Sequence, residues 1–266
     1  MQFGICNKES KQNRGMSVWN NVLCTAILPV RNEALNISRL ISSIPSFIDE
    51  IIVVDGNSID GSLELAQSID SVSIAVRQVQ KGKGAALSLG FSLASGEYVF
   101  VLDTDGSMDP NELPLFANAL DSGASAVKGS RNLPNAGSDD LTHFRNAGND
   151  LLTGLTNRLY GSNLSDITYG YWGIRRKTLH ELELTRFDEN PPGRISHRAM
   201  TYGQGFEIEA LMLCRLLRAK ETFVEVPCWE NERWSGSSNL HAISDGVRTL
   251  LAIFRERLKK SGQNLG

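Results

Sequence analysis

The stretch Tyr98–Pro110, "YVFVLDTDGSMDP", joins an apolar run to an acidic ending. Residues 98–102 are aromatic, β-branched or leucine, a composition typical of a buried strand. Asp103 and Asp105 follow at once, one residue apart, and Gly106 comes next. Two like charges at the end of a buried strand repel each other and resist desolvation. We therefore expect a positive group to sit between them.

The sequence around this stretch alternates between two patterns. Strands are predicted at 23–30, 50–55, 72–78, 97–103 and 124–129, and helices near 34–44, 61–69, 84–94 and 111–120. Apolar strands separated by short helices indicate βαβ units and a mainly parallel sheet. We therefore predict an α/β fold with a mainly parallel central sheet and helices on both faces.

Three of the predicted strands end in polar residues, at Pro29–Glu33, Asp55–Ser58 and Asp103–Asp105. Asp, Asn and Gly are ordinary turn formers, so one such ending would not by itself indicate a binding site. Ligands of parallel α/β sheets gather beyond the carboxyl ends of the strands. Three endings of this kind on successive strands therefore favour a single binding site.

The second half of the chain has a different organisation. Helices are predicted at 145–160, 206–220 and 241–259, and extended segments at 166–175 and 222–226. Residues 185–205 are rich in Pro, Gly and basic side chains and lack periodicity. A long irregular loop inside a compact domain is often a functional lid or a disordered insertion, and we predict a mobile lid here.

Composition excludes several classes of protein. The 266 residues are 41% hydrophobic with a net charge of −3, which gives no electrostatic case for nucleic-acid binding. The four cysteines lack metal-ligand spacing and are expected to be reduced, mostly buried thiols. No apolar run approaches the roughly 20 residues that span a bilayer. We expect a cytoplasmic protein, with peripheral contact at the inner face of a membrane left open.

The two aspartates suit a hard divalent cation with oxygen ligands. Mg2+ or Mn2+ would relieve the repulsion between Asp103 and Asp105 and could bridge to substrate phosphates. A bare D-x-D pattern is weak, but its position after a buried strand and before Gly106 strengthens it. A metal together with a diphosphate implies a nucleotide-linked substrate.

Eight stretches in order carry a family resemblance: "ILPVRNEALNISRLI", "IIVVDGNSIDGS", "GKGAALSLGF", "LDTDGSMDP", "GSRN", "DITYGYWGIRR", "GFEIEA" and "ERWSGSSNL". The chain resembles family 2 glycosyltransferases with the GT-A fold, of the dolichyl/polyprenyl-phosphate mannosyltransferase kind. The resemblance implies one Rossmann-like domain at 21–260, with a nucleotide-binding half at 21–130 and an acceptor-binding half at 131–260. Residues 1–20 are left as a flexible tail. The resemblance also implies inverting transfer of a mannose- or glucose-type sugar from GDP-mannose or a UDP-sugar, with Mg2+ or Mn2+ on the diphosphate.

Matching positions carry the family's functional residues onto this chain. Those implied for the donor are Pro29, Arg31, Asn32, Glu33, Asp55, Lys83, Asp103, Thr104 and Arg233, with Asp103 and Asp105 as metal ligands. Arg131 and Arg145 stand where the acceptor phosphate is bound, although Arg145 could instead pair with Asp139 or Asp140. Asn32 and Glu33 could instead belong to the start of a helix.

The chain departs from the family pattern at two positions. Ser107 stands where a glutamine commonly helps to bind the cation, so direct ligation by this residue is doubtful. Asn239 stands where a lysine is often found, so part of the phosphate clamp is altered.

Helical periodicity separates two glutamates. Glu209 falls on the apolar face of its predicted helix, and Glu207 lies beside Arg218 on the polar flank. A carboxylate on a buried face is costly unless it is paired or used, so Glu209 is the stronger catalytic candidate. Glu207 is expected to form a surface pair.

The stretch "DITYGYWG" contains a further carboxylate and three aromatic side chains. Asp166 could contact a sugar hydroxyl or the acceptor. Tyr169, Tyr171 and Trp172 could line a sugar or lipid groove, but we expect them to pack in the core.

The nature of the acceptor decides which residue is needed for catalysis. A polyprenyl phosphate brings an anionic oxygen and needs no strong base, so Asp105, Arg131 and Arg145 would carry the reaction. A soluble hydroxyl acceptor would require Glu209 or Asp166 as general base. A nucleotidyltransferase is disfavoured because "PVRNEALN" lacks a glycine cluster, and a non-catalytic module would not need both aspartates. We expect a phosphate-bearing lipid or small-molecule acceptor.

Overall fold

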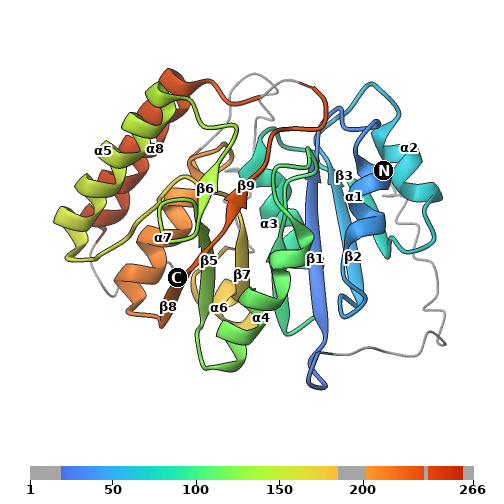
Figure 1. Ribbon diagram of the computed structural model, residues 1–266, viewed down its shortest axis with the longest axis horizontal. Helices are drawn as coiled ribbons and strands as arrows, with labels where there is room; N and C mark the ends of the chain where they lie inside the picture. Colours follow the sequence, from blue (N-terminus) through green and yellow to red (C-terminus); the bar gives the residue numbers. More distant parts are fainter. Residues whose placement is uncertain (1–18, 185–201, 237–238, 260–266) are drawn as a thin grey trace, which may run out of the picture.

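The computed structural model describes residues 19–184, 202–236 and 239–259, with a seven-stranded sheet in the order β3-β2-β1-β4-β7-β5-β8 (Figure 1). The strands are β1 (Cys24–Val30), β2 (Glu50–Asp55), β3 (Ile74–Arg77), β4 (Tyr98–Val101), β5 (Ala126–Ser130), β7 (Trp172–Arg175) and β8 (Phe223–Pro227). The predicted α/β fold with a mainly parallel sheet is confirmed.

Strand pairing places the polar endings at one edge of the sheet. β1 pairs in parallel with both β2 and β4, and β2 pairs in parallel with β3. β7 is antiparallel to β4 and to β5, while β5 and β8 are parallel. Strands from both predicted halves of the domain therefore complete one sheet.

Helices cover both faces of this sheet (Figure 1). They are α1 (Ile37–Ser43), α2 (Ser62–Ser68), α3 (Lys83–Leu93), α4 (Leu113–Asp121), α5 (His143–Tyr160), α6 (Arg176–Glu181), α7 (Ile208–Ala219) and α8 (Ala242–Leu258), with the 3-10 helix η1 (Pro110–Glu112). α1, α2 and α4 share one buried apolar cluster, and α3, α6 and α7 share another on the opposite face. α8 packs along α7, and α5 packs against both.

One local expectation was wrong, and one pair of short strands was not anticipated. The segment 166–175 is a strand only from Trp172, because the Asp166 side chain accepts hydrogen bonds from the backbone nitrogens of Thr168 and Tyr169 and closes a turn. The short parallel pair β6 (Gly137–Ser138) and β9 (Trp229–Glu230) was not predicted, because two residues carry no periodicity.

Several other expectations concern the whole chain. The predicted tail lies outside the described residues except at 19–20, and the predicted lid lies outside them except at 202–205. Within the described ranges, no helix is long and apolar enough to cross a membrane. Cys24, Cys214 and Cys228 are buried free thiols, as expected.

Candidate active site

A cleft of about 1230 Å³ opens at the carboxyl ends of the parallel strands. The loops after β1, β2, β3 and β4 supply one wall. α5, the start of α7 and the segment leading into α8 supply the other. Every predicted site residue except Asn32, Asp55 and Asp166 lines this cleft.

Asn32 and Asp55 shape the loops behind the cleft wall. Asn32 adopts a positive φ of 58° and accepts a hydrogen bond from the Ile59 nitrogen. The Asp55 carboxylate is fully buried, where it accepts from the Ser58 nitrogen and from Arg77 Nε at 3.1 Å. Both side chains are thus used to hold their own loops.

The acidic stretch 103–105 is already neutralised by basic side chains. Lys83 Nζ, at the start of α3, lies 2.8 Å from Asp103 Oδ1. Arg233 Nη1 forms an ion pair with Asp105 Oδ2. Burial raises the pKa of Asp103; Lys83 opposes this rise, and the charge of Asp105 adds to it. Each of the two carboxylates therefore has a cation of its own, Lys83 for Asp103 and Arg233 for Asp105.

A divalent cation would still fit here if the protein supplied only some of its ligands. Among the described residues, no cluster of three or more His, Cys, Asp or Glu could hold a metal by itself. Mg2+ is commonly held by one or two carboxylates, with waters and substrate phosphates completing its shell. Asp103 keeps 28% of its side chain exposed, towards the cleft. Ser107 Oγ donates to Asp105 Oδ1 at 2.7 Å, so it orients this carboxylate.

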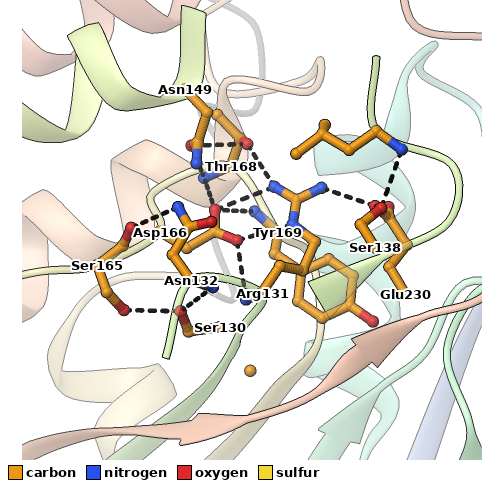
Figure 2. A network of polar contacts seen from close by, with 12 residues as sticks. Ser130, Arg131, Asn132, Ser138, Asn149, Ser165, Asp166, Thr168, Tyr169 and Glu230 are labelled. Carbon is orange, nitrogen blue, oxygen red and sulfur yellow. Dashed lines mark hydrogen bonds and ion pairs between the residues drawn. The ribbon is translucent and has the colours of Figure 1, made fainter. Parts of the chain in front are cut away.

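Arg131 lies at the centre of a buried polar network (Figure 2). Its Nε donates to Asp166 Oδ2 at 2.7 Å, and its Nη2 donates to Asp166 Oδ1 at 3.0 Å and to Thr168 Oγ1 at 2.9 Å. Nη1 donates to Glu230 Oε2 at 3.0 Å. These bonds use most of the five guanidinium donors. Arg131 therefore holds the loop after α5 and β9 in place, with little capacity left for a ligand.

Burial alone would raise the pKa of Asp166. The charges of Lys128 and Arg131 outweigh burial and hold this pKa well below its usual range. Lys128 is itself fully buried, and its Nζ donates to the Asp166 carbonyl at 2.8 Å. A carboxylate stabilised in this way is a weak base.

A hydrogen-bonded chain leads from this network to the cleft. The nitrogen and the hydroxyl of Thr168 both donate to Asn149 Oδ1, at 3.2 and 2.9 Å, which sets the orientation of the amide. Within the described residues, Asn149 Nδ2 has no hydrogen-bond partner. Asn149 lies one turn along α5 from Arg145, and both line the cleft. Arg145 Nη1 is 3.2 Å from Asp140 Oδ2, the alternative partner that the sequence left open.

Glu209 is buried at the start of α7, as its periodicity predicted. Its Oε1 lies 3.1 Å from Lys83 Nζ, and its Oε2 accepts from Trp172 Nε1 at 2.5 Å. Lys83 therefore links Glu209 to Asp103. Tyr169, Tyr171 and Trp172 are all buried, as expected.

The expectation that Glu207 forms a surface pair was wrong. Its side chain is buried, accepts from the Gly203 nitrogen and pairs with Arg248 Nη2 at 2.6 Å. Arg248 belongs to α8, which packs along α7 and covers the flank that periodicity marked as polar.

Comparison with known families identifies the class of enzyme. The model for glycosyl transferase family 2 matches residues 25–183. The chain belongs to this family. It is 30% identical to the polyprenol monophosphomannose synthase of Mycolicibacterium smegmatis, over 80% of this chain and 79% of that one. It is also 30% identical to the dolichol-phosphate mannosyltransferase of Saccharomyces cerevisiae, over 81% and 80% of the two chains.

Solved structures agree on the fold of this family 2 glycosyltransferase. The glucosyl-3-phosphoglycerate synthase of Mycobacterium tuberculosis, in complex with Mn2+, UDP and phosphoglyceric acid, matches with a TM-score of 0.67. The match covers 91% of this chain and 81% of that one at 17% identity. The predicted GT-A fold is confirmed.

Sequence reasoning missed several residues of the cleft. Gln78, Lys81, Asn149 and Glu230 all line it. Lys81 comes directly before the quoted segment "GKGAALSLGF" that contains Lys83, a signal that could have been used. Asn149 gave no such signal, because only the fold brings Thr168 to its side-chain oxygen.

Proposed function

We propose that this glycosyltransferase moves a mannose- or glucose-type sugar from a nucleotide-diphosphate sugar to a polyprenyl-phosphate-like acceptor, with inversion at the anomeric carbon. The donor would lie along the loops after β1 to β4, where Pro29, Arg31 and Glu33 line the cleft. The acceptor would enter from the side of α5 and α8, where Arg145 lines it. The relatives named for polyprenol- and dolichol-phosphate mannosyl transfer support this choice of acceptor.

One observation carries the choice of a phosphate acceptor: both candidate bases are engaged by cations. Glu209 is held by Lys83 and Trp172, and Asp166 is held by Arg131 and Lys128. A hydroxyl nucleophile needs a base that can take its proton. An acceptor phosphate brings an anionic oxygen instead, so positioning and charge stabilisation suffice.

A divalent cation, Mg2+ or Mn2+, forms part of this proposal. Asp105 and Asp103 would hold it against the donor diphosphate. When bound, it would stabilise the negative charge that develops on the leaving diphosphate. Lys83 and Arg233 lie at the same carboxylates and add positive charge to that side of the cleft.

The surface beside the cleft supports a lipid acceptor. α8 exposes an apolar stripe: Ile243, Val247, Leu251, Phe254 and Leu258, each between 42% and 81% exposed. At about 100° per residue, these positions fall within roughly 80° of one another around the helix. Arg255 and Arg257 are exposed at the end of α8 and suit anionic headgroups. The neighbouring α5 exposes Phe144 and Leu151, which also line the cleft.

Product analysis tests the transfer itself. GDP-mannose and UDP-glucose are offered with Mn2+ and either a short polyprenyl phosphate or the matching polyprenol, which differs only in lacking the phosphate. We expect transfer to the phosphate and none to the alcohol. We also expect Glu209→Gln to lower kcat only modestly. Transfer to hydroxyl acceptors, with kcat collapsing in Glu209→Gln, would establish the soluble-hydroxyl alternative.

Vesicle co-sedimentation tests the membrane contact. The double change Val247→Ser with Leu251→Ser removes the middle of the α8 stripe and should reduce binding to vesicles that contain anionic phospholipid. Leu115→Ser is the matched control, because Leu115 is an exposed apolar residue of α4, on another part of the molecule. Equal binding of all three proteins would contradict a role for α8.

A further inference from the structure

Arg233 forms an ion pair with Asp105, one of the two carboxylates that would bind the proposed metal. We propose, on the basis of the function above, that Arg233 is a built-in substitute for the metal at Asp105. Trp234 is the positioning residue that keeps it there. Metal binding then depends on the arrival of the donor diphosphate, which gives Arg233 a new anionic partner.

The segment that carries Arg233 is fastened to the acidic loop by its backbone. The Asn231 nitrogen donates to the Ser107 carbonyl at 2.9 Å, and the Trp234 nitrogen donates to the Asp105 carbonyl at 2.9 Å. The segment thus runs alongside residues 105–107. Arg233, between these two anchors, meets the Asp105 carboxylate without depending on a long flexible loop.

The Trp234 ring also holds the segment against the acidic loop. A Cβ added at Gly106 would lie 2.2 Å from Trp234 Cδ2, so the indole rests directly on the glycine backbone. The Arg39 guanidinium lies 4.0 Å from the ring centroid, and Ser235 Oγ donates to Asn36 Oδ1 at 2.8 Å. The indole is therefore clamped between the acidic loop and α1. The indole next to Arg233 thereby fixes the segment relative to the acidic loop.

The charges around Asp105 explain the coupling to the donor. Among the described residues, Asp103 and Glu209 form ion pairs with Lys83, Asp105 forms one with Arg233, and all five line the cleft. A dication that entered alone would displace Arg233 from Asp105 and leave two cations side by side. A diphosphate that entered with the metal would accept the displaced guanidinium, which matches phosphate oxygens well. Arg233 Nε also lies 3.5 Å from Asp140 Oδ2, so the side chain keeps a neighbouring carboxylate as it turns.

The test measures Mn2+ binding by the full-length protein, without and with UDP or GDP. Free Mn2+ is followed by its electron paramagnetic resonance spectrum. Wild-type protein should bind Mn2+ weakly alone and at least about tenfold more tightly with the nucleoside diphosphate. Arg233→Gln should change the two measurements in opposite directions. Its affinity for Mn2+ alone should rise about tenfold or more, the range for releasing a charge-assisted bond, and its affinity for the nucleoside diphosphate should fall.

Two sets of control variants separate this effect from general electrostatics. Lys81→Gln removes the same charge from an exposed residue of the same cleft, so it should change Mn2+ affinity much less than Arg233→Gln. Trp234→Ala should reproduce the rise in Mn2+ affinity although the guanidinium remains. Trp234→Phe, which keeps a ring against Gly106, should restore the wild-type value in part.

Several outcomes would overturn the inference. They are equal Mn2+ affinity with and without diphosphate in the wild type, or a loss of Mn2+ affinity in Arg233→Gln. A change in Lys81→Gln as large as that in Arg233→Gln would also overturn it, since charge alone would then explain the result. The proposed function fails differently: no sugar would reach any phosphate acceptor, whatever the Mn2+ measurements show.

Discussion

Two arginines that line the cleft, Arg131 and Arg233, each pair with an aspartate, and the two pairs differ in how completely their hydrogen bonds are satisfied. In the pair of Arg131 with Asp166, the side chains are 3% and 0% exposed, and Thr168 and Glu230 take further donors of the guanidinium. In the pair of Arg233 with Asp105, the exposures are 22% and 7%. Within the described residues, Arg233 Nε is buried without a hydrogen bond.

This difference separates a structural pair from one that can exchange partners. Breaking a buried, saturated pair leaves an uncompensated charge inside the protein, so such a pair persists. The pair of Arg233 with Asp105 is less completely buried on the arginine side, so water screens it more and the arginine can leave at a lower cost. Both arginines lie in motifs shared with the family, at "GSRN" and "ERWSG", so the sequence alone could not tell them apart.

The largest expected effect is on stability, from Arg131→Ala. The change leaves Asp166 and Glu230 without their buried cation, so the free energy of unfolding should fall by about 3–5 kcal/mol. Arg131→Lys should recover only part of this, because an ammonium cannot reproduce the bidentate contact. Urea unfolding followed by circular dichroism measures both. A loss below about 1 kcal/mol would mean that the network is not a structural unit.

The same pair should make stability depend on acid, with a smaller effect. The pKa of Asp166 is lower in the folded state than in the unfolded chain. The stabilisation is therefore fully present above the unfolded value of about 4, and it is lost as the pH falls through the folded pKa. The difference in unfolding free energy between wild type and Asp166→Asn should be constant from pH 7 to 5 and should shrink below about pH 4. A difference that stays constant down to pH 3 would contradict this sign.

The change Arg145→Ala should weaken binding of the acceptor. Losing a charge-assisted hydrogen bond costs about 1.5–3 kcal/mol, so the acceptor KM should rise about 10- to 150-fold if it tracks binding. The donor KM should hardly change. Arg158→Ala is the matched control, since Arg158 is an exposed arginine of the same helix. Equal increases in the two variants would show that only the charge of α5 matters.

The predictable part of the molecule was the part governed by local patterns. β2 matches its predicted range of 50–55, and Glu209 is buried as its periodicity indicated. The errors arose where distant segments meet. Glu207 is buried because α8 covers α7, and the Asp166 carboxylate, which closes a local turn with two backbone nitrogens, is held by the distant Arg131.

Partners of the acidic stretch were the hardest part to predict from the sequence. The sequence predicted a divalent cation at Asp103 and Asp105 but did not predict which basic side chains pair with them. Lys83 reaches Asp103 from the start of α3, and Arg233 reaches Asp105 from a segment more than a hundred positions away in the chain. Pairing over such a separation depends on the order of strands in the sheet, in which β7 lies between β4 and β5.

The smallest expected effect is the stability change caused by Arg233→Gln. Because the Arg233 side chain is 22% exposed, water screens its attraction to Asp105. Removing the charge also relieves Arg233 Nε of burial without a hydrogen bond. The free energy of unfolding should therefore change by less than about 1 kcal/mol, and raising the ionic strength should reduce the change further. Urea unfolding at low and at high salt, alongside Arg131→Ala, measures this. A loss of about 3 kcal/mol would place both arginines in one structural class. A small change in stability, together with altered Mn2+ binding, would leave Arg131 as support and Arg233 as the exchangeable partner.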